Sequence, residues 1–258
     1  MKAVLLVGGL GTRLRPLTFS IPKPLLPVGE KPILQIILEQ LRRADFGEVI
    51  LATGYQAELL QAFCGDGSKF GVSLSYIREA KPLGTAGPLS LLRDRFKPDE
   101  HFLLMNGDIL TKLDFRAFLD SSRENNWDLQ VGYTDHVYRS PFGVLSIVDG
   151  LVKDVVEKPR QEFAVSAGIY ALKGSTLDFV PDNEFYTVPD LMRQLNAAGK
   201  TVAAYHIADC WIGLDSVSHF EEACKVIGDA PVEETRAAQA ESHVATTTPS
   251  GHRQRTAH

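Results

Sequence analysis

Residues 2–13 read KAVLLVGGLGTR, an apolar stretch that leads directly into three glycines, a threonine and an arginine. The run from Ala3 to Val7 is apolar and partly β-branched, which is typical of a buried parallel strand. Glycines placed directly after the first strand of an α/β fold let backbone N–H groups approach an anion closely. The stretch therefore predicts a parallel sheet with an anion-binding loop at the end of its first strand.

Three alternatives to this interpretation differ in what else they require. A dinucleotide-binding fingerprint needs a third glycine near position 14, where Leu14 stands, and an acidic residue closing the second strand, where Thr53 and Gly54 stand. A phosphate-binding loop of the Walker type needs a Gly-Lys-Ser/Thr sequence that does not follow here. A structural turn without a ligand remains open, but it leaves the cations that follow unexplained.

Those cations continue the stretch through residues 14–32, LRPLTFSIPKPLLPVGEKP. Lys23 stands between two prolines, which stiffen the backbone and hold the ammonium group in place. Arg13 offers a planar set of donors suited to phosphate oxygens. A glycine loop and two cations so close together favour a triphosphate site over a plain turn.

Strands and helices alternate along the first half of the chain. The segments 48–54, 72–79 and 101–108 are strand-like, whereas 31–46, 56–63, 84–96 and 114–125 are helix-like. This βαβα order predicts an α/β fold, a Rossmann-like αβα sandwich with a mostly parallel sheet.

After residue 127 the pattern changes. The segments 128–135, 142–149, 151–158 and 165–173 are strand-like with little helix between them, and Asp149-Gly150 is a hairpin signal. We expect a smaller antiparallel lobe packed on the first part, closed by helices at 188–200 and 216–227. The expected catalytic domain is 1–228, divided near residue 127, and residues 229–258 have the composition of a disordered tail.

Composition excludes several classes of protein. The 258 residues carry a formal net charge of −5, which argues against nucleic-acid binding. The three cysteines, Cys64, Cys210 and Cys224, form no CxxC pattern, so neither a disulfide framework nor a zinc site is favoured. Without a secretory segment or a membrane span in the sequence, we expect a cytoplasmic protein that does not contact the membrane.

Residues 8–32 resemble the signature of the sugar-1-phosphate nucleotidylyltransferases, and further landmarks follow in order: LGTAGPL, NGD, FGV, EKP and AGIY. The resemblance extends to about Glu222, and within the family the motifs are nearest to the mannose-1-phosphate guanylyltransferase-like enzymes. It implies a Rossmann-like fold with a smaller sugar-binding lobe. The implied reaction joins an NTP and a sugar 1-phosphate to give an NDP-sugar and pyrophosphate.

The resemblance also implies roles for the nucleotide-binding part. Arg13 would bind the β- and γ-phosphates, and Lys23 the α-phosphate and the sugar phosphate. Asp108, at the carboxyl end of a predicted strand, would hold Mg²⁺ as cofactor; an Asx-turn is its structural alternative. The backbone of the glycine loop would surround the triphosphate, and two residues of the LGTAGPL segment would contact the base. The implied nucleotide-binding residues are Gly8, Gly9, Gly11, Thr12, Arg13, Gly84 and Thr85.

For the sugar, the resemblance implies that Glu157 binds hydroxyl groups and that Lys158 binds the phosphate. Gly143 and Gly168 would let the sugar approach the backbone. An exposed ion pair is the structural alternative for Glu157 and Lys158. Ser166 stands where the family often has Asn, which departs from the usual sugar contact.

A second departure concerns the metal. Many relatives have an aspartate two residues after a tryptophan, whereas here Gly213 fills that position and Asp215 lies four residues after Trp211. Asp215 either reaches the metal or serves the N-terminus of the helix that follows it. Both alternatives remain open in the sequence.

The motifs favour GTP, while CTP, dTTP and UTP remain alternatives. A non-catalytic regulatory paralogue that binds an NDP-sugar is the alternative from another class. Such a protein is expected to lose Arg13, Lys23 or Asp108, and all three are present. The expected partners are the two small-molecule substrates, and the resemblance leaves a homo-oligomer open.

Overall fold

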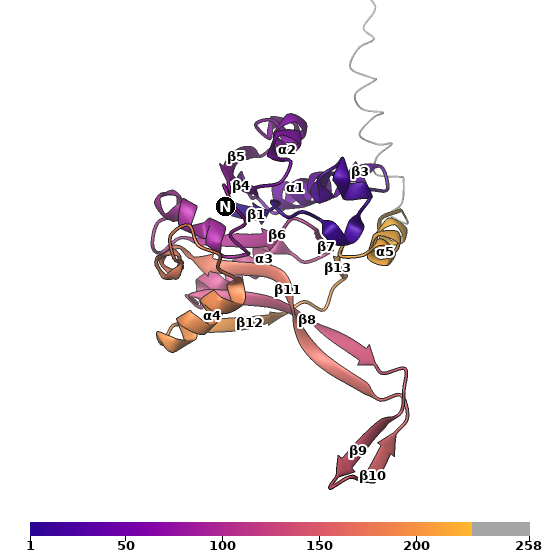
Figure 1. Ribbon diagram of the computed structural model, residues 1–258. Coiled ribbons are helices and arrows are strands. Elements are labelled where there is room, and N and C mark those ends of the chain that lie inside the picture. Colours follow the sequence, from indigo (N-terminus) through magenta and orange to yellow (C-terminus); the bar gives the residue numbers. More distant parts are fainter. Residues whose placement is uncertain (229–258) are drawn as a thin grey trace, which may run out of the picture.

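The computed structural model describes residues 1–228, and the expected tail at 229–258 lies outside them (Figure 1). A seven-stranded sheet forms the centre, with the strand order β12-β8-β11-β6-β1-β4-β5. Only antiparallel pairings join β11 to its two neighbours, whereas the other neighbouring strands of this sheet pair in parallel. The predicted αβα fold with a mostly parallel sheet is confirmed.

The strands of the central sheet are β1 (Lys2–Leu6), β4 (Glu48–Thr53), β5 (Ser73–Arg78), β6 (His101–Asn106), β8 (Leu129–Arg139), β11 (Arg160–Lys173) and β12 (Val202–His206). The short strands pair two by two and are β2 (Pro27–Val28) with β3 (Lys31–Pro32), β7 (Ile109–Thr111) with β13 (Trp211–Gly213), and β9 (Val144–Val148) with β10 (Leu151–Val156). The sheet continues across residue 127, so both expected parts of the domain share it.

The helices cover both faces of this sheet. The α-helices are α1 (Ile33–Arg43), α2 (Ala57–Cys64), α3 (Phe115–Glu124), α4 (Val188–Ala197) and α5 (Val217–Gly228). The 3₁₀ segments are η1 (Thr12–Leu14), η2 (Leu17–Phe19), η3 (Lys23–Leu25), η4 (Ser68–Phe70), η5 (Gly87–Arg95) and η6 (Gly174–Phe179). Among the helices of residues 1–228, none has the length and apolar character needed to cross a membrane.

The two faces of the sheet hold separate cores because side chains alternate along each strand. Ala3 and Leu5 of β1 face the core that α1, α2 and α3 cover, whereas Val4 faces the core under η5, η6 and α4. The helices begin at clear signals: Asp114 caps α3, and Thr187 with Asp190 forms a capping box at α4. The sheet is therefore fixed from both sides.

The segment predicted as a helix at 84–96 forms the 3₁₀ segment η5 over Gly87–Arg95 instead. The backbone N–H groups of Ala86 and Gly87 both donate to the carbonyl of Tyr186, at 2.9 and 3.0 Å. The first N–H groups of the segment are therefore bonded to a distant part of the chain. A pattern read only from neighbouring residues could not predict it.

The antiparallel part forms a projecting arm and not a packed lobe (Figure 1). The ends of β8 and β11 leave the sheet as a ribbon that carries the β9–β10 hairpin, whose turn at Asp149-Gly150 confirms the hairpin signal. We define the arm as residues 135–164, none of which is buried. Its exposed large apolar side chains are Val137, Tyr138, Phe142, Val144, Leu145, Ile147, Val148, Leu151, Val152, Val155, Val156 and Phe163. The antiparallel strands expected after residue 127 are confirmed, but they project from the first part and do not pack closely on it.

The cysteines whose side chains are described carry free thiols. Cys64 is buried and Cys210 is half-buried, whereas the side chain of Cys224 lies outside the described part. Burial raises the pKa of the Cys64 thiol to about 11, so this thiol stays protonated at neutral pH.

Candidate active site

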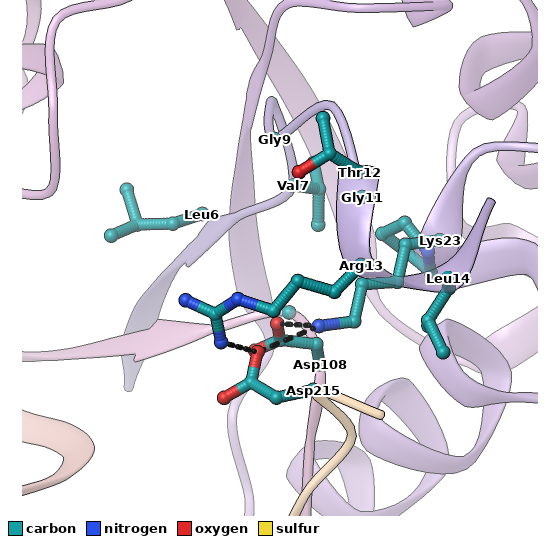
Figure 2. A pocket seen from close by; sticks show the side chains of 12 residues that line it. Leu6, Val7, Gly9, Gly11, Thr12, Arg13, Leu14, Lys23, Asp108 and Asp215 are labelled. Atoms are coloured by element: carbon teal, nitrogen blue, oxygen red, sulfur yellow. Dashed lines mark hydrogen bonds and ion pairs between the residues drawn. The ribbon is translucent and has the colours of Figure 1, made fainter. Parts of the chain in front are cut away.

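A pocket of about 230 Å³ lies where β1 and β6 end (Figure 2). These strands are neighbours and run in parallel, so their carboxyl ends open onto the same edge of the sheet. The pocket contains most of the residues expected around the triphosphate. Its lining is Leu6, Val7, Gly9, Gly11, Thr12, Arg13, Leu14, Lys23, Pro24, Gly107, Asp108 and Asp215.

The glycine loop brings bare backbone to the pocket at two positions. Gly11 has a φ of +58°, and a Cβ there would come within 2.9 Å of the Cγ2 atom of Thr18. The Thr18 hydroxyl also donates to the Gly11 carbonyl at 2.8 Å, which holds the turn. Gly9 borders open space, with no atom within 4 Å of an added Cβ. The loop shape thus requires glycine at 11, while Gly9 leaves room for a ligand.

Gly8, expected at the triphosphate, lies outside the pocket lining. An added Cβ would come within 2.8 Å of Glu79 Oε1 and 3.0 Å of Gly54 N. The Tyr55 N–H donates to the Gly8 carbonyl at 3.3 Å. Gly8 therefore serves the close approach of the first loop to the end of β4.

Two cations and two carboxylates meet in the pocket (Figure 2). The Lys23 Nζ atom lies 2.5 Å from Asp108 Oδ2 and 3.3 Å from Asp215 Oδ1. One guanidinium nitrogen of Arg13 lies 3.2 Å from the same Asp215 oxygen. The Lys23 side chain is 11% exposed and that of Arg13 is 74% exposed. Lys23 is thus fixed inside the pocket, while Arg13 reaches over it from solvent.

A short strand pair brings the two carboxylates together. Asp108 stands directly before β7, and β13 pairs with β7 so that Gly213 lies opposite Ile109. The Leu214 N–H then donates to the Asp108 carbonyl at 3.0 Å. Asp215 is the next residue, so its position relative to Asp108 is set by backbone pairing.

Ser216, and not Asp215, caps the start of the helix that follows. The Ser216 hydroxyl accepts a hydrogen bond from the His219 N–H at 3.3 Å, in the first turn of α5. The carboxylate of Asp215 instead contacts Arg13 and Lys23. The alternative of Asp215 as a helix cap is not needed to explain this helix start.

The pair of carboxylates fits a divalent cation. Asp108 and Asp215 converge on a single ammonium group, so their oxygens already lie around a position that accepts positive charge. Within residues 1–228, no group of three or more Asp, Glu, His or Cys residues could hold a metal. A hard divalent cation suits two carboxylates, because such a cation takes oxygen ligands and can complete its shell with water.

The residues expected at the sugar divide between two places. Gly143, Glu157 and Lys158 lie on the arm, where Glu157 Oε2 is 3.0 Å from the Cβ position of Gly143, and none of them lines the pocket. Gly168 lies in the body, with a φ of +69° and a Cβ position 2.6 Å from Asn106 Nδ2. Most of the residues expected at the sugar therefore lie on the arm, apart from the pocket expected to bind the phosphates.

The two residues expected at the base lie outside the lining as well. The Thr85 hydroxyl accepts a hydrogen bond from the Val188 N–H at 2.9 Å, so it caps the start of α4. Gly84 has a φ of +80°, and its Cβ position is 2.6 Å from the Tyr186 carbonyl oxygen. Both residues fix the junction between this segment and α4.

Sequence reasoning missed Glu79, which directly follows β5. Its Oε2 atom accepts a hydrogen bond from the Leu83 N–H at 2.9 Å, and Oε1 lies toward Gly8. Burial raises the pKa of this carboxyl, and the hydrogen bond from Leu83 opposes the shift. Its place at the carboxyl end of a strand is the signal that could have revealed it.

Comparisons with known proteins identify the family to which the chain is similar. The family model described as nucleotidyl transferase matches residues 2–228. Mannose-1-phosphate guanylyltransferase 1 from Arabidopsis thaliana is 37% identical over 185 residues, which cover 69% of this chain and 51% of that protein. UTP--glucose-1-phosphate uridylyltransferase from Synechocystis is 31% identical over 245 residues, 87% of this chain and 63% of that protein. The chain spans about half the length of the guanylyltransferases it matches.

One solved structure supports the same fold and carries a nucleotide analogue. HddC from Yersinia pseudotuberculosis, in complex with GMP-PN, superposes with a TM-score of 0.68 at 26% identity. The match covers 88% of this chain and 99% of that one.

Proposed function

Because the chain belongs to the nucleotidyl transferase family, we propose that it transfers a nucleotidyl group from an NTP, with GTP favoured, to a sugar 1-phosphate. The products are an NDP-sugar and pyrophosphate. The observation that carries the proposal is the meeting of Arg13, Lys23, Asp108 and Asp215 beside a glycine loop. This arrangement matches the needs of a reaction between two phosphates.

In the proposed reaction, an oxygen of the sugar phosphate attacks the α-phosphorus of the NTP. A new P–O bond forms in line with the bond between the α-phosphorus and its bridging oxygen, and that bond breaks. Its electron pair leaves with pyrophosphate. The attacking oxygen is already an anion at neutral pH, so the reaction needs no general base. The barrier lies in bringing anions together, which positioning and positive charge lower.

The cations have distinct proposed roles. Lys23, held in the pocket, would contact the α-phosphate and the sugar phosphate, and the more exposed Arg13 would contact the β- and γ-phosphates and the departing pyrophosphate. The backbone of Gly9, Gly11 and Thr12 would complete the contacts with the triphosphate. In the structure, both cations pair with carboxylates. On binding, the substrate phosphates would replace these carboxylates as the partners of Arg13 and Lys23.

Asp108 and Asp215 would hold Mg²⁺. The bound ion supplies positive charge that neutralises phosphate oxygens and the leaving group. The two carboxylates fit this role because they come from two paired segments that keep them close.

The guanylyltransferase relatives support GTP, and the uridylyltransferase relative keeps the other bases open as alternatives. Glu79 adds a chemical argument for guanine. A carboxylate only accepts hydrogen bonds, and the N1–H and the amino group of guanine are adjacent donors. Glu79 lies between the glycine loop and the segment with Gly84 and Thr85, where the base is expected.

A matrix of five nucleotides against a panel of sugar 1-phosphates tests the function, with pyrophosphate release as readout. We expect release with GTP and at least one sugar, dependent on Mg²⁺ and abolished by a chelator. Release with CTP, dTTP or UTP alone would keep the reaction class and correct the base. Binding of an NDP-sugar without release from any pair would instead support the regulatory paralogue.

A further inference from the structure

Trp211 makes a hydrogen bond to a distant strand from its place in β13, four residues before Asp215. Its indole Nε1–H donates to the Ala167 carbonyl at 2.8 Å. Ala167 is fully buried, and it lies where the register of β11 with β8 shifts between Ser166 and Tyr170. It has no opposite residue in the registers of β11 with β8 or with β6. The indole therefore holds β11 at the point where its ladder is irregular.

This irregular point of β11 packs against the segment that carries Asp108. The residue after Ala167 is Gly168, and a Cβ there would come within 2.6 Å of Asn106 Nδ2 and 2.7 Å of Ile109 Cδ1. Asn106 ends β6 and Ile109 begins β7, so Asp108 stands between the two residues that Gly168 contacts. The hydrogen bond from the indole therefore supports the segment from which Asp108 reaches the pocket.

The ring of Trp211 also packs on the strand that leads to Asp215. Trp211 and Gly213 are two residues apart in β13, so they face the same side of the strand. A Cβ at Gly213 would lie 3.3 Å from the nearest carbon of the ring and 3.9 Å from Asp215 Oδ2. The Asp215 N–H donates to the Gly213 carbonyl at 2.8 Å, which closes a tight turn. The bare backbone at Gly213 thus lets the ring lie directly against this turn.

We propose that Trp211 is a positioning residue that sets the two carboxylates of the pocket at the spacing a divalent cation needs. Its N–H holds β11 against the residues on either side of Asp108, and its ring supports the turn to Asp215. Both carboxylates face the Lys23 ammonium group (Figure 2). Trp211 does not line the pocket, so it acts through the residues it holds. The use of the carboxylates as metal ligands rests on the proposed function.

Binding of Mn²⁺ without nucleotide tests this role apart from turnover, because Mn²⁺ takes the same oxygen ligands as Mg²⁺. Water-proton relaxation measures the Kd. Trp211→Phe keeps a ring but loses the N–H donor, and it should raise the Kd for Mn²⁺ by about tenfold, as changes behind metal ligands typically do. Trp127→Phe is the matched control, because it makes the same exchange at a tryptophan outside the pocket lining and should leave the Kd unchanged. Asp215→Asn should also raise the Kd, which places the bound ion at the pocket.

Three results of this titration would overturn the proposal. The first is a Kd of Trp211→Phe equal to that of the wild type. The second is a wild type without saturable Mn²⁺ binding, and the third is binding that Asp215→Asn leaves unchanged, because in both cases no ion depends on the positioned carboxylates. Circular dichroism checks that each variant is folded.

A second variant tests the contact between the ring and the strand, and it keeps the indole N–H. Gly213→Ala places a methyl group 3.3 Å from the ring, so the ring must move. We expect a higher Kd for Mn²⁺ in the chain with Trp211. In the background of Trp211→Phe, whose smaller ring leaves room, the same change should add little. This double-mutant cycle measures the coupling, and additive effects of the two changes would overturn the role of the ring.

The Mg²⁺ dependence of turnover distinguishes positioning from a general loss of structure. At limiting Mg²⁺, Trp211→Phe should release pyrophosphate about tenfold more slowly than the wild type. Saturating Mg²⁺ should restore most of the rate, and the KM for GTP should stay nearly unchanged. A loss that excess Mg²⁺ does not restore would indicate a merely structural role and overturn the proposal.

These measurements separate the role of Trp211 from the proposed function. If the wild type releases no pyrophosphate from any substrate pair, the proposed function fails, and the Mn²⁺ titrations still decide the role of Trp211. If the wild type is active and Trp211→Phe matches it in Mn²⁺ affinity and Mg²⁺ dependence, the proposed function stands and the positioning role is overturned.

Discussion

The body and the arm of this chain differ in how their apolar side chains are buried. In the body, strands such as β6 are buried on both faces, and helices cover each side of the sheet. In the arm, residues 135–164 include no buried side chain, although the sequence there is rich in valine, leucine and isoleucine. The body thus contains both buried cores and the charged site. The arm is rich in apolar residues, as a core strand is, but no other part of the described chain covers its side chains.

The largest expected effect is a loss of turnover when the site in the body is changed. Asp108→Asn removes a charge from the pair of carboxylates around Lys23 and should lower kcat by about 10²–10³-fold, about 3–4 kcal/mol of transition-state stabilisation. Steady-state pyrophosphate release measures it, with circular dichroism to check the fold. Asp120→Asn, which removes a surface ion-pair partner, is the control expected to keep activity. A variant at position 108 with near-normal turnover would show that the metal assignment is wrong.

Stability should differ sharply between the two regions. Leu103→Ala in the buried strand β6 should cost about 2–5 kcal/mol of the free energy of unfolding, because it leaves a cavity. Phe163→Ala in the arm removes a larger side chain that is 49% exposed, and should cost less than about 0.5 kcal/mol.

Urea unfolding followed by tryptophan fluorescence measures both changes, since Trp127 and Trp211 lie in the body. Equal losses for the two substitutions would mean that the arm belongs to the core after all.

A smaller effect on the free energy of unfolding should distinguish Gly11 from Gly9, two glycines of the same loop. Gly11→Ala forces a side chain into a left-handed conformation against Thr18 and should cost about 1–2 kcal/mol. Gly9→Ala meets open space and should leave the unfolding free energy unchanged. Thermal unfolding compares them. A stable Gly11→Ala variant would show that the loop adapts without its glycine.

The smallest effect concerns a buried histidine of the body. His101 is 6% exposed and its Nε2 lies 3.0 Å from the Trp127 carbonyl, and burial lowers the pKa of this histidine below its usual value near 6.5. Below that value the unfolded chain binds more protons than the folded one, so stability should fall as pH decreases, by at most about 1.4 kcal/mol per pH unit. Urea unfolding at several pH values measures the slope. His101→Gln should flatten it, and an unchanged slope would exclude His101 as its source.

Local patterns sufficed for much of the body. The apolar run at β1 and the helical spacing of Ile33, Ile37 and Leu41 predicted buried elements that the structure confirms. The parallel order of strands also placed Asp108 at the edge where the pocket lies. These features depend on neighbouring residues and on one general rule of sheet topology.

Other features depend on contacts between distant residues. The close approach of Gly8 to Gly54 and the capping of α4 by Thr85 join segments that no local pattern connects. The arm escaped prediction for another reason. Its alternating apolar residues have the pattern of strands buried on one face, although none of the residues 135–164 is buried in the structure.

The pairing of β7 with β13 has a consequence for the order in which this protein is made. Asp108 and Asp215 are separated by 107 positions of the sequence, although the Leu214 N–H to Asp108 carbonyl hydrogen bond makes them neighbours in space. At about 5–20 residues per second, a ribosome needs about 5–20 s to travel that distance. During this interval the nascent chain has Lys23 and one carboxylate but not the other, and so its site closes only when nearly the whole domain has been synthesised.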